Sequence, residues 1–219
     1  PIADRTLLAI GLFSMLVAVL FLLGTRDFKR LMAYSSVEHM GILVMASALG
    51  RIGVWAALFH VWANCLSKGS LFLSAGNIRR AAGARTMDEV RGMSTLTPHS
   101  AAIFVTGMFA VTACPPFAPF FSELLVIRTA FETQHGFAAA AFLGCLLFAF
   151  FGLTRLVFAI VDGRPRTASR RLSQHFSETR GLILPPLILL GLAVWLGLAT
   201  PTVLREAWTA AAAQLYPTP

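Results

Sequence analysis

The sequence predicts an all-α protein, a polytopic membrane bundle of about six transmembrane helices with one helix broken by proline. Of its 219 residues, 57% are hydrophobic and only 13% are charged. The mean hydropathy of +0.73 is far above that of soluble domains. The apolar residues gather in stretches of about 20, the length that a helix needs to cross a bilayer. Short arginine-rich segments separate these stretches, as topology signals do.

The composition also limits the classes of function that the chain can have. The formal net charge of +8 does not indicate nucleic-acid binding, because the basic residues lie in short segments between apolar stretches. The three cysteines, Cys65, Cys114 and Cys145, each lie alone in an apolar stretch. They lack the paired spacing of a zinc site, an iron–sulfur cluster or a disulfide framework. We therefore expect no cofactor and no metal in this chain, and we assign any redox centres to partner subunits.

The first two apolar stretches are predicted helices with different character. Residues 7–24 contain no ionisable side chain and predict a helix that packs against lipid and other helices. Residues 31–50 carry Glu38 and His39 within their first turns, which places the pair near the membrane entrance. An adjacent carboxylate and imidazole are suited to passing protons. The alternative is that both side chains are simply hydrated or cap a neighbouring helix.

The third stretch, residues 53–77, carries Lys68 near its middle, one of only two lysines in the chain. His60, Asn64 and Lys68 recur every four residues, which aligns them on one face of a helix. Polar side chains in a membrane helix face other protein or a wet cavity, so this stripe predicts a functional site. The alternative is that Lys68 extends along its stem to the membrane surface while His60 and Asn64 bond to neighbouring helices.

The fourth stretch, residues 101–131, is interrupted by Pro115, Pro116 and Pro119, which predict a break near the middle of the membrane. Broken membrane helices line cavities, and transporters build ion sites on them. Glu123 follows the break by one turn and is therefore a candidate for proton transfer. The alternative is a structural ion pair between Glu123 and Arg155 or Arg128.

The remaining stretches are residues 136–161, which carry Arg155, and residues 182–200, followed by a short segment over 202–216. Residues 25–30, 78–100 and 162–181 together hold twelve Lys and Arg, against four in the segments on the opposite side. The positive-inside rule places these three segments in the cytoplasm and both ends of the chain outside. We therefore expect a multi-pass protein located in the cytoplasmic membrane of a prokaryote.

Three motifs carry a resemblance to a known family: DFKRLMAYSSVEHMG at 27–41, FHVWANCLSKGSLFLSAG at 59–76 and PPFAPFFSELL at 115–125. Together they resemble the antiporter-like membrane subunits of respiratory complex I, Mrp-type cation/proton antiporters and group 4 nickel–iron hydrogenases. The phrase YSSVEHMG is most similar to the branch of hydrogenase-4 component F and formate hydrogenlyase.

This resemblance implies that the chain is the later part of a longer polypeptide and covers the second of two inverted five-helix repeats. It implies a repeat over 1–162 with its break near 115–119, a basic cytoplasmic loop over 163–181, and a further transmembrane helix with a short C-terminal segment over 182–219. Lys68 matches the family's central lysine, His60 its histidine neighbour and Glu123 the ionisable residue of the broken helix. Asn64 departs from the family pattern, because relatives often have a second histidine there, so a water would have to bridge His60 and Lys68.

The sequence thus predicts a non-catalytic, proton-conducting subunit of a membrane-bound oxidoreductase complex. Its expected relay consists of Lys68, His60, Glu123, Asn64, Glu38 and His39, with Arg155 and Lys29 as electrostatic tuning residues. Expected partners are the lipid bilayer, other membrane subunits and a soluble redox arm carrying iron–sulfur clusters and a nickel–iron centre. Two alternatives remain: an Mrp-type sodium/proton antiporter with ligands from Glu123, Thr106 and Thr112, and a non-conducting membrane scaffold.

Overall fold

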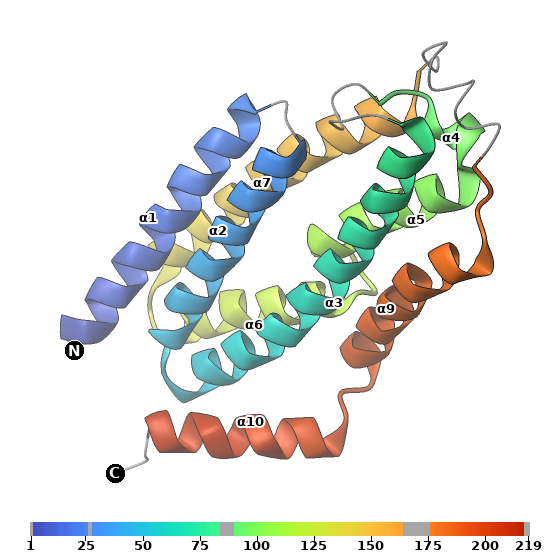
Figure 1. Cartoon of the computed structure of the whole chain (residues 1–219). Coiled ribbons are helices and arrows are strands. Elements are labelled where there is room, and N and C mark those ends of the chain that lie inside the picture. Colours follow the sequence, from blue (N-terminus) through green and yellow to red (C-terminus); the bar gives the residue numbers. More distant parts are fainter. Residues whose placement is uncertain (1, 26–27, 84–89, 164–175, 217–219) are drawn as a thin grey trace.

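The computed structural model describes residues 2–25, 28–83, 90–163 and 176–216. All regular structure in these ranges is helical, as the composition predicts (Figure 1). The helices are α1 (Ile2–Gly24), α2 (Phe28–Ser47), α3 (Gly50–Ala82), α4 (Met93–Leu96), α5 (Pro98–Val111), α6 (Ala118–Glu132), α7 (Gly136–Val161), α9 (Arg180–Leu198) and α10 (Thr202–Leu215).

Among the described residues, three helices are both long and apolar enough to cross a membrane: α1, α7 and α9. The chain is therefore a membrane protein. Helices α2 and α3 have 20 and 33 residues, sufficient length to cross, but both include charged and polar positions. Several of these polar side chains are buried in the bundle, so they lower the hydropathy of the helix without facing lipid. The expected total of about six spans remains a prediction.

Helices α1 and α2 cross at two glycines. A Cβ on Gly11 would lie 2.6 Å from the backbone nitrogen of Met45, and one on Gly41 would lie 2.8 Å from the carbonyl oxygen of Gly11. Small residues allow membrane helices to approach this closely. The crossing fixes the position of α2, which carries Glu38 and His39.

Helix α3 lies at the centre of the bundle and contacts α2, α5, α6, α9 and α10. It is longer at both ends than the predicted 53–77 and stops at Gly83, whose φ of 60° is left-handed. Arg79 and Arg80 occupy its last turn, where positive charge complements the helix dipole. Lys68 lies about 20 Å from the nearer end of α3 by helix rise.

Pro186, one of two prolines inside α9, is accommodated by a polar side chain of α3. Pro186 has no backbone N–H, so the carbonyl of Leu182 loses its normal partner within the helix. The side-chain amide of Asn77 donates to this carbonyl at 2.8 Å. One helical turn further on, the Ser70 hydroxyl donates to the carbonyl of Pro186, also at 2.8 Å. These bonds join α9 to the central helix.

Helix α5 ends at Val111 and α6 begins at Ala118, so the chain leaves helical geometry at the run of prolines. Ala113 adopts a left-handed conformation there, with φ of 53°. The other side of the break packs tightly on α9, because a Cβ on Gly197 would lie 2.9 Å from the Ala118 nitrogen and 3.0 Å from the Pro116 carbonyl oxygen. Pro115 and Pro116 are exposed, whereas Phe117, Ala118 and Pro119 are buried, so the break enters the packed interior where α6 begins.

Helix α10 lies across the end of the bundle where the N-terminus is found (Figure 1). Trp208 is buried there against Trp55 and Phe59 of α3, with ring centroids 5.4 and 5.6 Å away. Tyr216 donates to the Asp4 carboxylate, and its oxygen also lies 3.1 Å from the Ser47 carbonyl. Tyr216, the residue after α10, therefore connects the end of that helix to the first turn of α1 and the last turn of α2.

The ends of α1, α3 and α7 that adjoin the arginine-rich segments lie at the opposite end of the bundle (Figure 1). This arrangement is compatible with the predicted topology, in which the arginine-rich segments lie on one side of the membrane and both ends of the chain lie on the other.

Candidate functional site

A cluster of buried polar side chains lies where α2, α3 and α6 meet. Glu38, His39, His60 and Glu123 are each at most 3% exposed, and Lys68 is 7% exposed. The depth of Glu38 and His39 in the membrane remains a prediction, and the structure shows where they lie in the bundle. Glu38 lies about 15 Å from the start of α2 by helix rise, and both side chains are enclosed, because their helix begins earlier and packs against α3. Neither is hydrated at the surface nor caps a neighbouring helix.

His60 is held by a hydrogen bond on each side of its ring. Its Nδ1 lies 2.8 Å from Ser122 Oγ, and its Nε2 lies 2.9 Å from His39 Nδ1. The Ser122 hydroxyl has a single proton and donates it to the carbonyl of Pro119 at 2.9 Å. The hydroxyl therefore accepts from His60, whose proton resides on Nδ1 and whose Nε2 lone pair faces His39. A hydrogen bond from His39 Nδ1 to His60 Nε2 completes the arrangement.

Lys68 is bonded to α2 and does not extend to the membrane surface. Its Nζ donates to Ser36 Oγ at 3.1 Å, and that hydroxyl donates to the Met32 carbonyl at 3.0 Å. Because Lys68 and His60 both engage residues of α2, this helix connects the two ends of the polar stripe.

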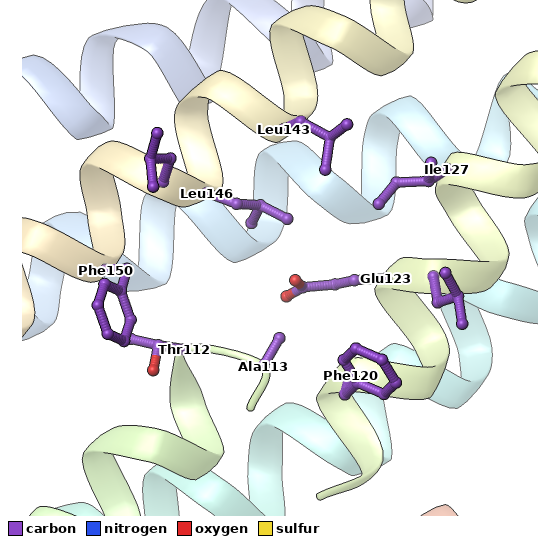
Figure 2. Close-up of a pocket in the computed structure, with 10 residues that line it drawn as sticks. Thr112, Ala113, Phe120, Glu123, Ile127, Leu143, Leu146 and Phe150 are labelled. Carbon is purple, nitrogen blue, oxygen red and sulfur yellow. The ribbon is translucent and has the colours of Figure 1, made fainter. Parts of the chain in front are cut away.

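Glu123 extends from the second turn of α6 into a cavity between α5, α6 and α7 (Figure 2). This cavity has a volume of about 310 Å³ and apolar walls that include Phe120, Leu146 and Phe150. A second space of about 10 Å³ lies behind it and is bounded by Glu38, His39 and Glu123. That volume is enough for about one water molecule. The carboxylate thus separates an open cavity from the interior of the cluster.

The two carboxylate oxygens of Glu123 have no hydrogen-bond partner in the described part of the chain. Neither ion pair weighed from the sequence forms. The Arg155 guanidinium donates to the carbonyls of Leu23 and Thr25 at the end of α1, and Arg128 pairs with Glu132 on its own helix. Glu123 is therefore an uncompensated buried group, which is typical of functional positions in membrane proteins.

The other expected site residues lie outside these contacts. Asn64 is buried between His60 and Lys68, and its Oδ1 has no protein partner among the described residues, which leaves this oxygen able to accept from a water. Lys29 is exposed at the start of α2. The tuning roles of Lys29 and Arg155 remain predictions.

Two contributors were missed by the sequence reasoning. Ser122 precedes Glu123, and only the packing of α6 on α3 brings it to His60. Ser36 lies in the polar first turns of α2, but no signal in the sequence pairs it with Lys68, 32 positions away. A partial signal existed for Ser36, because it lies three residues before His39 and so on the same side of α2.

The described residues contain one group with the donor types and spacing for a metal ion. One nitrogen each from His39 and His60 and one oxygen from Glu123 lie within 4.8 Å of one another. The three cysteines are not among these donors.

Comparison with known proteins gives the family. The profile described as "NADH:quinone oxidoreductase/Mrp antiporter, TM" matches residues 1–149. The hydrogenase-4 component F homolog of Methylacidiphilum infernorum is 34% identical over 184 residues, which cover 84% of this chain and 37% of that protein. Hydrogenase-4 component B of Escherichia coli is 30% identical, with 88% of this chain and 32% of that protein covered.

The fold also matches a chain in the structure of the membrane-bound sulfane sulfur reductase, an archaeal respiratory membrane complex. The TM-score is 0.85 at 23% identity, and the match covers all of this chain and 35% of that one. The chain thus spans about a third of the length of the relatives that it matches. On the family match and the coincidence of its motifs, this chain belongs to the antiporter-like membrane subunits of the NADH:quinone oxidoreductase/Mrp antiporter family.

Proposed function

We propose that the chain is the part of a proton-translocating subunit that carries its second helical repeat. The complex would be a membrane-bound oxidoreductase of the hydrogenase-4 or formate hydrogenlyase type. The observation that supports this most strongly is the buried cluster. Its polar side chains come from three helices, and its central histidine has bonds to the other two. Such a cluster is costly in a membrane, so a transport role accounts for it better than packing does.

The proposed path runs from Lys68 to Glu123 through α2. Lys68 is bonded to Ser36, two residues before Glu38 on α2, and Glu38 shares the small water-sized space with His39 and Glu123. His39 is bonded in turn to His60. This differs from the route expected from the sequence, in which His60 reached Lys68 directly through water. Both ring nitrogens of His60 are engaged elsewhere, so in this proposal Asn64 and a water form at most a side branch.

The membrane placement follows from the same arrangement. Helices α2, α3 and the α5–α6 pair would cross the bilayer together with α1, α7 and α9, giving about six spans. The arginine-rich segments would face the cytoplasm of a prokaryotic cell. The rest of the same polypeptide would supply the other repeat, and partner subunits would supply the soluble arm with its iron–sulfur and nickel–iron centres, since no part of the described cluster is suited to electron transfer.

A sodium/proton antiporter of the Mrp type is the second candidate. Thr112 lines both cavities together with Glu123, which places two oxygen donors beside each other. Thr106 is exposed and donates to the Ala102 carbonyl within its own helix, so it does not join them. Transport that requires sodium would favour this candidate over proton translocation alone.

Proton uptake into sealed vesicles that contain the whole complex tests the proposal. Glu123→Gln removes the charge at nearly constant volume, and Lys68→Arg keeps the charge but removes the ability to release a proton. We expect both variants to lose proton uptake while electron transfer and assembly continue. Glu132→Gln is the matched control, because this carboxylate lies on the same helix but is exposed and paired with Arg128.

Undiminished uptake in both Glu123→Gln and Lys68→Arg, at matched electron-transfer rate, would make this part of the subunit a scaffold.

A further inference from the structure

We propose that His39, His60 and Glu123 form a binding site for a divalent transition-metal cation, with Zn²⁺ as the best fit. Bound there, the cation would replace the hydrogen bond between the two imidazoles, and the ring proton of His39 would move from Nδ1 to Nε2, as ligation through Nδ1 requires. The inference is drawn from the arrangement of donors and does not require that the cluster conduct protons.

The donor set is of the right kind. Two imidazole nitrogens and one carboxylate oxygen lie within 4.8 Å of one another, each from a different helix, and all three side chains are buried. Two histidines with one glutamate, plus a water, form a well-known tetrahedral zinc arrangement. Magnesium and calcium require six or more oxygen ligands, so a site with two nitrogens selects against them.

A second observation points to a ligand at this place. Glu123 is 3% exposed, yet neither of its oxygens has a hydrogen-bond partner in the described part of the chain. One of these oxygens is the carboxylate donor of the group. A buried carboxylate without protein partners either takes up a proton or binds a cation.

The neighbouring residues orient the ligands. Ser122 accepts the Nδ1 proton of His60, so the Nε2 lone pair of this ring is directed at His39. A hydrogen bond to the distal nitrogen is the usual support of a metal-binding histidine. The two facing nitrogens are 2.9 Å apart, whereas tetrahedral zinc would hold them about 3.3 Å apart. The two nitrogens therefore need to separate by only a few tenths of an ångström, while the Glu123 oxygen, which lies within 4.8 Å of both, would approach them by up to about 1.5 Å.

The site also has enough space for a water ligand and enough negative charge to offset that of the cation. The space of about 10 Å³ beside His39 and Glu123 has room for one water as the fourth ligand. Glu38 borders the same space and, with Glu123, offsets the charge of the cation. Lys68 opposes it, but its ammonium is bonded to Ser36. The cavity of about 310 Å³ reaches Glu123 from outside the cluster and provides an approach (Figure 2).

Equilibrium dialysis of the purified complex against Zn²⁺ tests this inference, with bound zinc counted by atomic absorption after surface metal is removed by a weak chelator. The count is taken as a difference between variants, because partner subunits contribute their own metals. We expect the wild type to bind about one more zinc per chain than Glu123→Gln or His60→Asn. Ser122→Ala retains all three ligands and should weaken the affinity about 10-fold.

Co²⁺ is the second probe, since a tetrahedral cobalt site with nitrogen and oxygen ligands absorbs in the visible range. The band should appear in the wild type and be absent in Glu123→Gln. His99→Asn and His135→Asn control for an exposed and a half-buried histidine outside the cluster and should change neither the zinc count nor the band. Equal zinc binding by the wild type, Glu123→Gln and His60→Asn would overturn the inference. Dialysis needs no turnover, so loss of proton transport alone leaves it standing.

Discussion

The hydroxyl of Ser122 determines which tautomer His60 adopts. Ser122→Ala removes the acceptor of the Nδ1 proton and leaves that buried N–H unpaired, which costs about 1–3 kcal/mol. We expect a lower melting temperature and slower proton uptake, because the ring is free to change its tautomer and its bond to His39. The measurement is thermal unfolding of the complex together with proton uptake in vesicles.

Ser74→Ala is the control for this change. Ser74 is a buried serine on α3 whose hydroxyl bonds only to carbonyls of its own helix, so its loss should not alter transport. Ser122→Thr retains the hydroxyl and should restore uptake. If Ser122→Ala moves protons as fast as the wild type, the assignment of Ser122 as the positioning residue of His60 is wrong.

The sequence could predict the residues of the cluster better than their connections. Spacing by four places His60, Asn64 and Lys68 on one face of α3, and the prolines locate Glu123 just after a break. No local sequence pattern indicates which neighbouring helix contacts that face of α3. The bonds from His60 to Ser122 and from Lys68 to Ser36 depend on how three helices pack together, and separations of 62 and 32 residues carry no periodic signal.

At the scale of helices, α3 supplies the donor that proline removes from α9. Asn77→Leu leaves the Leu182 carbonyl without a partner and should destabilise the protein by about 1–3 kcal/mol. Pro186→Ala restores an N–H four residues after Leu182, so the double variant should recover part of this loss. Thermal unfolding of the four proteins of this cycle gives the coupling. Additive losses would contradict the assigned role of Asn77.

Helix α5 is capped from a distant part of the chain. The Glu178 carboxylate accepts from the backbone N–H groups of Ser100 and His99 at the start of α5, and from the His99 ring. Partial burial raises the pKa of Glu178, but these hydrogen bonds outweigh burial, so the pKa is lowered from its ordinary value of 4.5. The sequence shows the proline and serine of this helix start but not the carboxylate that caps it.

This cap makes stability depend on pH. A lowered pKa in the folded state means that the stabilisation is present above the pKa of the unfolded carboxyl and is lost as pH falls through the folded value. Glu178→Gln should therefore lower the melting temperature at pH 7, and the difference from the wild type should shrink below about pH 4. Glu132→Gln, an exposed carboxylate on α6, should show no such pH dependence. An equal difference at both pH values would exclude capping by the charged form.

At the scale of the whole molecule, the charge distribution predicts an orientation. Ser94 and Thr209 are exposed positions near opposite ends of the bundle, in α4 and α10 (Figure 1). In a variant without native cysteines, Thr209→Cys should react with a membrane-impermeant maleimide in intact cells. Ser94→Cys should react only after the membrane is opened. The reverse pattern would invert the proposed topology.

The packing at the break between α5 and α6 restricts how that break can move. On one side the backbone of α9 at Gly197 lies against Pro116 and Ala118 with no room for a methyl group. On the other side lies the cavity of about 310 Å³ into which Glu123 projects. Displacement of the start of α6 is therefore one-sided: it is blocked toward α9 and permitted toward the cavity. Any such step would move Ser122 and Glu123 together, because they are adjacent on α6, and would change the contact between Ser122 and His60.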